Sequence, residues 1–190
     1  DVKFSGVSWY KNEGFYYSSY DKPVGSELSA KTDQHKLYYH KLGTAQSEDK
    51  VVFGGDIKRR YVGGGVTEDN RYLIISAANA TSSNELYLVD LTQPKFEIKT
   101  VVDNMTFDYD VIDNRGSKLY VISNNNAPNK KLMIIDANHP ESSNWKDVIA
   151  ETENVLSVST GGGYVFANYM KDAISVVKQY DYDGALLSEV

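Results

Sequence analysis

The chain has 190 residues, 41% of them hydrophobic, and a formal net charge of -6 from acidic and basic residues scattered along the sequence. A nucleic-acid partner is not expected, because proteins that bind nucleic acids concentrate basic residues on one surface. The absence of cysteine excludes disulfides, thiolate metal sites and a cysteine nucleophile, but leaves the compartment open between cytoplasm and periplasm. No apolar run is long enough to span a membrane, so no membrane partner is expected. The first residues lack the layout of a signal peptide, and the chain begins as though cut from a longer one.

Aromatic and β-branched runs recur in pairs along the chain and predict successive strands. The earlier members of the four pairs are residues 14–21, 71–79, 118–126 and 163–172, and the later members are residues 36–43, 85–92, 131–138 and 175–184. Equivalent positions in the later members are 49, 46 and 45 residues apart, at Leu37, Leu86, Leu132 and Val177. A repeat of this length is typical of the blades of a β-propeller.

The sequence therefore predicts an all-β chain, a partial β-propeller of about four four-stranded blades that forms a single fragment over residues 1–190. The blades are expected at about residues 1–55, 56–103, 104–153 and 154–190. Strands of the first blade are expected at residues 4–10, 14–20, 36–42 and 50–53. The 15-residue loop from Asp21 to His35 is expected to be a mobile surface excursion.

Turn signals divide the later blades. In the second blade the first strand is expected to follow the glycines at 63–65, with a turn at 68–70 and an outer strand over 96–102. In the third, residues 113–116 predict a tight hairpin turn and residues 140–144 a short helical turn.

The fourth blade breaks off at residues 186–190, where an outer strand would begin. After the third strands of the last three blades, Asp90, Asp136 and Asp181 are expected to bond backbone amides in turns.

No catalytic residue can be assigned within the chain. A serine hydrolase of the α/β type carries its nucleophile in G-x-S-x-G, and the nearest approach, Ser8, has Tyr10 where the second glycine belongs. The glycine runs 63–65 and 161–163 do not continue into a phosphate-binding motif. They are interpreted as starts of innermost strands, where small residues allow backbones to approach closely.

Metal and cofactor sites are not expected either. His35 and His40 are five residues apart and fall on opposite faces of one strand, which favours hydrogen-bonded histidines over metal ligands. Asp108, Asp110 and Asp113 resemble the start of a calcium loop, but Ile112 stands where an oxygen ligand is needed. These aspartates are interpreted as surface carboxylates beside a hairpin.

Several longer sequence segments resemble the β-propeller domain of the prolyl oligopeptidase family. They are VKFS at 2–5, Trp9, FYYSSYDKP at 15–23, HKLYYHKLGTAQSEDKVVFGG at 35–55, EDNRYLIIS at 68–76, APNKKLMIIDANHPESSNWKDVIAE at 127–151 and DGALLSEV at 183–190. The resemblance spans the whole chain, and the segments occur in the same order as in the family's domain.

The resemblance implies part of a serine peptidase, of cytosolic or periplasmic type, that cleaves short peptides after proline. In that family a seven-bladed propeller covers an α/β-hydrolase domain that holds the Ser, Asp and His triad. This chain would supply roughly blades two to five, and the hydrolase domain, its partner in the same parent protein, is absent. The fragment alone is therefore expected to be inactive.

The resemblance also implies one substrate-binding residue. Phe4, in the VKFS segment, corresponds to a residue that forms an apolar wall for a substrate side chain upstream of the proline. The alternative is that Phe4 is an ordinary core aromatic on an inner strand. Two further pocket positions depart from the family pattern: one falls on Tyr61 or Val62, and a loop position falls on Ala78 and Thr81. No role is transferred to them.

Two other functions remain open. A free-standing propeller could bind a peptide or protein partner through its central opening. A propeller enzyme acting on glycosides or lactones would need convergent carboxylates or a metal at its axis. If the chain is a fragment, its terminal blades are bare, and self-association is expected.

Overall fold

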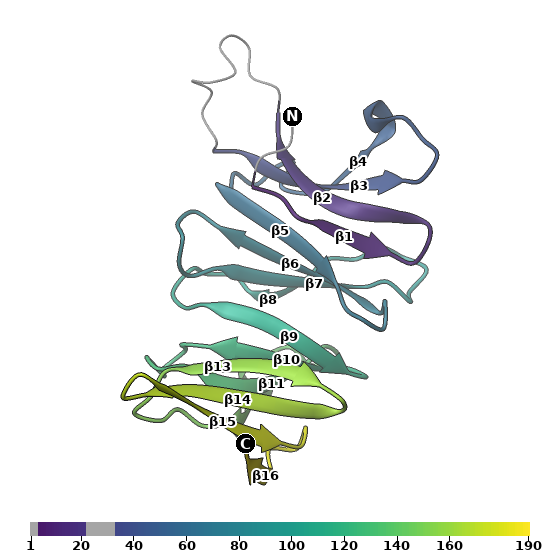
Figure 1. The fold of residues 1–190 in the computed structure, drawn as a ribbon. Helices are drawn as coiled ribbons and strands as arrows, with labels where there is room; N and C mark the ends of the chain where they lie inside the picture. The colour runs from purple at the N-terminus through teal and green to yellow at the C-terminus, as the bar shows by residue number, and fades with distance from the viewer. Residues whose placement is uncertain (1–3, 22–32) are drawn as a thin grey trace. The chain divides into compact units, whose positions relative to one another are not determined.

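The computed structural model describes residues 4–21 and 33–190, which form two compact units, residues 1–105 and 106–190 (Figure 1). Sixteen strands in the described residues make four antiparallel sheets of four strands each. In every sheet the strands lie side by side in chain order, as they do in a propeller blade. The predicted all-β fold of four four-stranded sheets is confirmed. Most of the predicted loop from Asp21 to His35 lies outside the described residues.

The first unit contains two sheets. The first sheet consists of β1 (Val7–Tyr10), β2 (Gly14–Tyr20), β3 (His35–Lys41) and β4 (Lys50–Phe53). The second consists of β5 (Tyr61–Val66), β6 (Tyr72–Ala78), β7 (Glu85–Asp90) and β8 (Lys99–Val102). A short 3-10 helix, η1 (Gln46–Glu48), precedes β4. The two sheets pack through β5, which contacts β1, β2 and β3 (Figure 1).

Apolar side chains from both sheets of this unit form one core. Leu37 of the first sheet and Leu73 and Ile75 of the second are fully buried in it. Alternate residues of β6 and β7, such as Leu73, Ile75 and Val89, belong to this core, because successive side chains of a strand point to opposite faces of its sheet.

Gly64 of β5 lies directly against Leu37 of the first sheet. A Cβ atom at this position would lie 2.6 Å from Cδ2 and 2.7 Å from Cδ1 of Leu37. A side chain there would overlap the core, so the glycine permits the close approach of β5 to β3.

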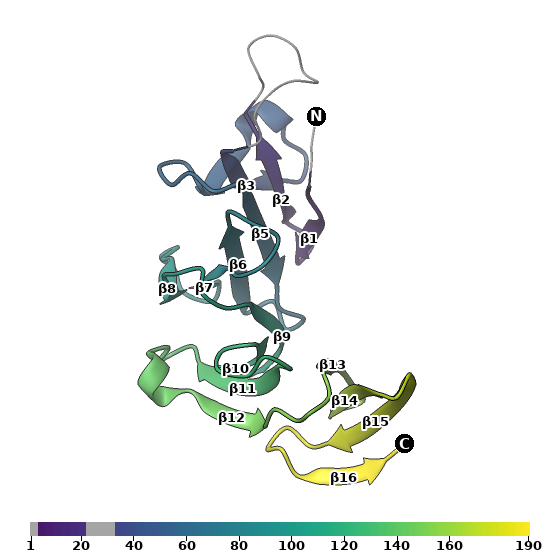
Figure 2. The ribbon, with the colours of Figure 1, turned by 90° about the vertical axis from the view of Figure 1, so that its left-hand side faces the viewer.

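The second unit repeats this arrangement. Its sheets are β9 (Tyr109–Arg115), β10 (Lys118–Ser123), β11 (Lys131–Asp136) and β12 (Lys146–Ile149), then β13 (Leu156–Gly161), β14 (Tyr164–Lys171), β15 (Ile174–Tyr180) and β16 (Leu186–Glu189) (Figure 2). Tyr120 and Leu132 from one sheet meet Leu156 and Val165 from the other in a shared core. The helical turn predicted at 140–144 is the 3-10 helix η2 (Ser142–Asn144). No helix in the described parts of the chain is long and apolar enough to cross a membrane.

Some local predictions were wrong. The glycines at 63–65 lie inside β5 rather than before it. In the run 161–163, Gly162 and Gly163 have φ of 58° and 85° and form the turn between β13 and β14, a conformation that favours glycine. The hairpin turn of the third sheet falls at residues 116–117, because residues 113–115 continue β9.

Two predicted strands have different limits, and one further strand was not predicted. The first strand begins at Val7 and not at Phe4, and β8 begins at Lys99 rather than at Phe96. The fourth sheet has the outer strand that the sequence did not reveal, since Leu186–Glu189 pairs with β15.

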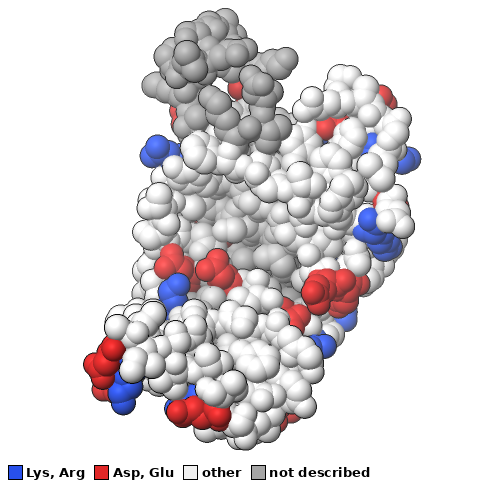
Figure 3. Space-filling model, viewed as in Figure 1, with Lys and Arg blue, Asp and Glu red and all other residues white. Residues whose placement is uncertain are grey.

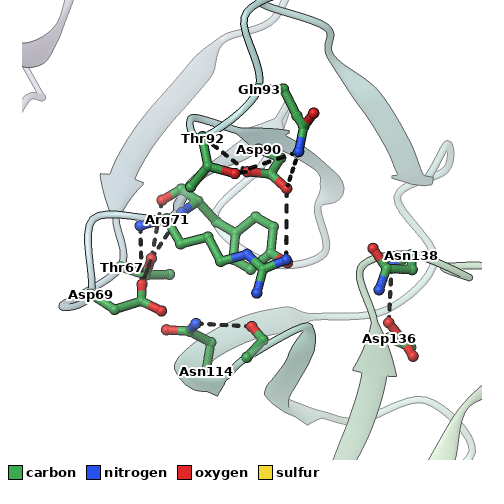
Figure 4. Close-up of polar contacts among 11 residues, drawn as sticks. Thr67, Asp69, Arg71, Asp90, Thr92, Gln93, Asn114, Asp136 and Asn138 are labelled. Carbon is green, nitrogen blue, oxygen red and sulfur yellow. Dashed lines mark hydrogen bonds and ion pairs between the residues drawn. The ribbon is translucent and has the colours of Figure 1, made fainter.

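The predicted turn-capping aspartates are confirmed. Oδ1 of Asp90 accepts a hydrogen bond from the Thr92 backbone N–H at 3.0 Å (Figure 4), and Oδ1 of Asp136 accepts one from Asn138 N–H at 2.9 Å. Asp181 Oδ1 accepts two, from the backbone N–H groups of residues 183 and 185, at 3.0 and 2.8 Å. Each carboxylate closes the turn that follows a third strand.

Candidate functional site

Phe4 lies at the edge of the first unit, ahead of β1 rather than in a strand. Its side chain is 68% exposed and its φ is 52°, in the left-handed region that non-glycine residues seldom adopt. The ring contacts the edge of Tyr61, with ring centroids 5.8 Å apart and planes 87° apart. Within the described residues Phe4 thus lies neither in an inner strand nor in a buried core.

Tyr61 forms the second half of this aromatic pair. It is the first residue of β5, is half-buried, and pairs with Ala78 at the end of β6. Its neighbour Val62 is only 2% exposed and belongs to the core. Of the two residues between which the sequence could not choose, Tyr61 is the one that reaches Phe4.

Arg60 completes the cluster, and sequence reasoning missed it. Its guanidinium carbon lies 5.4 Å from the centroid of the Tyr61 ring, within the range of a cation–π contact. The only signal in the sequence was an arginine next to an aromatic residue, which many exposed surfaces share. Phe4, Arg60 and Tyr61 are called the aromatic–cationic cluster below.

The backbone that carries this cluster is held from several sides. The Tyr20 hydroxyl donates to the carbonyl oxygen of Arg60 at 2.6 Å, and the Arg60 N–H donates to Oδ1 of Asn79 at 3.2 Å. These bonds come from the ends of β2 and β6, so both sheets of the first unit fix the position of Tyr61. A side chain on such a fixed segment loses little freedom when a ligand binds.

His35 forms hydrogen bonds to residues on both sides of Arg60 and Tyr61. It is 1% exposed, its ring stacks on Tyr20 at 4.2 Å, and its N–H donates to the carbonyl oxygen of Arg59 at 2.8 Å. Its Nδ1 accepts a hydrogen bond from Val62 N–H at 2.9 Å. The prediction of a hydrogen-bonded strand histidine is confirmed for His35, and its role in this chain is structural.

Arg59 contributes a charge that is already neutralised. Its Nε and Nη2 donate to the two carboxylate oxygens of Glu85 at 2.8 and 2.6 Å, a forked pair with Glu85 only 4% exposed. Hydrogen bonding to Glu85 raises the pKa of Arg59. Burial and the nearby Glu85 carboxylate raise the pKa of Tyr87 to about 12.

His40 is placed on the other face of β3, away from His35. Its Nδ1 lies 2.7 Å from Oδ1 of Asp49, and the Tyr17 hydroxyl donates to Oδ2 of the same carboxylate at 2.7 Å. The prediction of a hydrogen-bonded histidine is confirmed here too. The arrangement supports the sheet and contains no activated nucleophile.

The three aspartates at 108–113 do not converge on one point. Asp113 accepts a hydrogen bond from the Tyr182 hydroxyl and lies 3.8 Å from Arg115, whereas Asp108 accepts one from Asn124 at 3.2 Å. Across the described residues no group of three or more His, Asp and Glu side chains could hold a metal ion. The cluster around Phe4, by contrast, consists of two aromatic rings and one guanidinium.

Charged side chains on one face of the molecule are visible in Figure 3. On the face drawn in Figure 3, acidic and basic side chains are interspersed and most of the surface is uncharged. Alanine and threonine at positions 78 and 81, on which the other family pocket position falls, add no charge near the cluster.

Comparisons with known proteins agree on one family. The family model described as prolyl oligopeptidase, N-terminal beta-propeller domain, matches residues 1–190. The chain is 53% identical to the prolyl endopeptidase of Elizabethkingia meningoseptica and 51% identical to that of Elizabethkingia miricola, over 100% of its own length and 27% of theirs. Its structure is similar to ligand-free prolyl oligopeptidase B from Galerina marginata, with a TM-score of 0.86, 29% identity, and coverage of 100% of this chain and 27% of that one. The chain thus spans 27% of the length of these relatives.

Proposed function

The chain belongs to the prolyl oligopeptidase family, as part of its N-terminal β-propeller domain, and on that premise we propose that it is in the gating and substrate-selecting part of a serine peptidase that cleaves short peptides after proline. The catalytic triad would be supplied by an α/β-hydrolase domain of the same parent protein. The 190 residues alone would then be inactive. The similarity to two prolyl endopeptidases over the whole chain supports this proposal.

A second part of the proposal gives Phe4 the role of an apolar wall for a substrate side chain upstream of proline. The observation that carries it is a 68% exposed phenylalanine held against Tyr61 on a fixed backbone segment. An exposed aromatic pair of this kind can bury an apolar side chain of a ligand without rearranging a core. The Phe4 role also accords with the resemblance of the VKFS segment to the family.

Replacement of Phe4 in the full-length protein tests this role. Phe4→Ala is expected to lower kcat/KM on peptides with a bulky residue upstream of proline, and to alter cleavage of a minimal Gly-Pro substrate little. Val7→Ala is a matched control, since Val7 is also an exposed apolar residue of this edge but makes no contact with the cluster that the structure records. Equal losses on both substrate classes would assign Phe4 a packing role instead.

The isolated chain is further proposed to self-associate. Its first sheet exposes Val7 and Trp9, and its last sheet exposes Leu186 and Leu187. Exposed apolar side chains on terminal sheets favour association between copies, as do unpaired strand edges.

A further inference from the structure

Arg60 has no ion-pair partner in the part of the chain that the structure describes. Its side chain is exposed, and among the residues described no carboxylate forms an ion pair with it. Two acidic residues on segments that contact this one have other partners: Glu85 is bound by Arg59, and Asp21 is bound by Lys36 at 2.6 Å. The cation is therefore available to a ligand.

The position of this cation is set by its surroundings. The Arg60 backbone is bonded on both sides, by the Tyr20 hydroxyl and by Asn79, and its guanidinium lies over the Tyr61 ring. Stacking uses the face of a guanidinium and leaves the N–H groups at its edge free to donate. Such a group binds a carboxylate through two parallel hydrogen bonds.

We propose that Arg60 is a specificity-determining residue that favours peptides with an acidic side chain close to the apolar residue received by Phe4, on the amino-terminal side of proline. This inference rests on the proposed function, because it assumes that Phe4 faces the substrate. Tyr61 connects the two halves of the site, since its ring contacts both the Phe4 ring and the Arg60 guanidinium. The preferred substrate class is thus an acidic peptide with an apolar neighbour.

The test compares pairs of fluorogenic proline peptides that differ by a single Glu or Gln. The Glu or Gln is placed in turn at each of the three positions upstream of proline, and kcat/KM is measured with the full-length protein. At the position that Arg60 reaches, the Glu peptide is expected to be favoured about two- to fivefold at low salt, the range of an exposed ion pair. High salt should reduce this ratio toward one, because solvent-exposed charges are screened.

Variants assign the preference to Arg60. Arg60→Gln should bring the Glu-to-Gln ratio to about one, and Arg60→Glu should make Gln the favoured residue. Both substitutions keep the two backbone hydrogen bonds at this position, so the segment should remain folded. Lys95→Gln removes one charge from an exposed lysine elsewhere in the same unit and should keep the preference.

The outcomes separate this inference from the proposed function. If the protein cleaves after proline but shows no preference for Glu, or keeps it in Arg60→Gln, the role of Arg60 is wrong and the proposed function stands. If Lys95→Gln removes the preference as well, the effect is one of net charge and the role is again wrong. If no proline peptide is cleaved, both are overturned.

Discussion

Gly64 provides the sharpest test of how the two sheets of the first unit pack. In Gly64→Ala the new Cβ would lie 2.6 and 2.7 Å from the two Cδ atoms of Leu37 and 3.2 Å from its Cγ, where ordinary contacts are 3.4–4 Å. Leu37 is 0% exposed and cannot swing into solvent, so either its rotamer or the sheet spacing must change. Overpacking of this kind costs about 1–3 kcal/mol of unfolding free energy.

The neighbouring glycine supplies the control. A Cβ on Gly65 would meet nothing within 4 Å, and Gly65 has no positive φ. Gly65→Ala should therefore change the unfolding free energy by about 0.5 kcal/mol or less. Leu37→Val removes the clashing atoms, so the double variant with Gly64→Ala should lose less stability than the two single losses added, by about 0.5 kcal/mol or more.

Urea unfolding followed by tryptophan fluorescence measures these effects. The chain has two tryptophans, Trp9 in the first unit and Trp145 in the second, so a Trp145→Phe background reports the first unit alone. The midpoint shift gives the change in stability when the slope is unchanged. Equal stabilities for Gly64→Ala and Gly65→Ala, or additive losses in the double variant, would refute the close packing of β5 on Leu37.

Three further predictions follow from the described contacts. Burial, and then the charge of Asp183, raise the pKa of Tyr120 to about 12, so the fold favours the neutral phenol. The stability that this provides is fully present below pH ~10 and is lost as pH rises through ~12. Tyr120→Phe should therefore reduce the loss of stability seen in alkaline melting curves. Asp181→Ala removes the acceptor of two turn hydrogen bonds and should cost about 0.5–1.5 kcal/mol, whereas Asp181→Asn, which keeps an oxygen acceptor, should cost less; equal melting of both variants would contradict this. The isolated chain should sediment as larger species with increasing concentration, and Trp9→Ser should weaken the effect; a clean monomer at high concentration would count against it.

The sequence predicted the inner strands well because their signal is local. Leu73–Ile75 and Leu132–Ile135 are nearly continuous apolar runs, and a strand buried on both faces produces such a run whatever its neighbours are. The turn-capping roles of Asp90, Asp136 and Asp181 could also be predicted, because a carboxylate that accepts a hydrogen bond from an amide two residues ahead needs no distant partner.

Elements that depend on distant partners could not be predicted. All four residues of β16 are exposed, so no burial pattern marks them, and their pairing with β15 makes the strand. The glycines of β5 disfavour a strand by propensity, and Gly64 is required only because Leu37, 27 residues earlier, occupies the space beside it.

The residues of the candidate site also depend on partners that are distant in the sequence. Two roles for Phe4 are compatible with the sequence alone, because its exposure and its contact with Tyr61 depend on the fold. Arg60 gave no local signal, since its place depends on hydrogen bonds from Tyr20 and Asn79, which lie 40 and 19 residues away in the chain.

Cleavage by the full-length protein tests the central claim most directly. A fluorogenic Gly-Pro peptide is incubated with the purified protein before and after treatment with a serine-directed inhibitor, and with the isolated 190-residue chain in parallel. Cleavage after proline by the full-length protein, abolished by the inhibitor and absent from the isolated chain, is the result expected of the propeller domain of a prolyl oligopeptidase. No cleavage by a folded full-length protein, or cleavage that the inhibitor leaves unchanged, would contradict it.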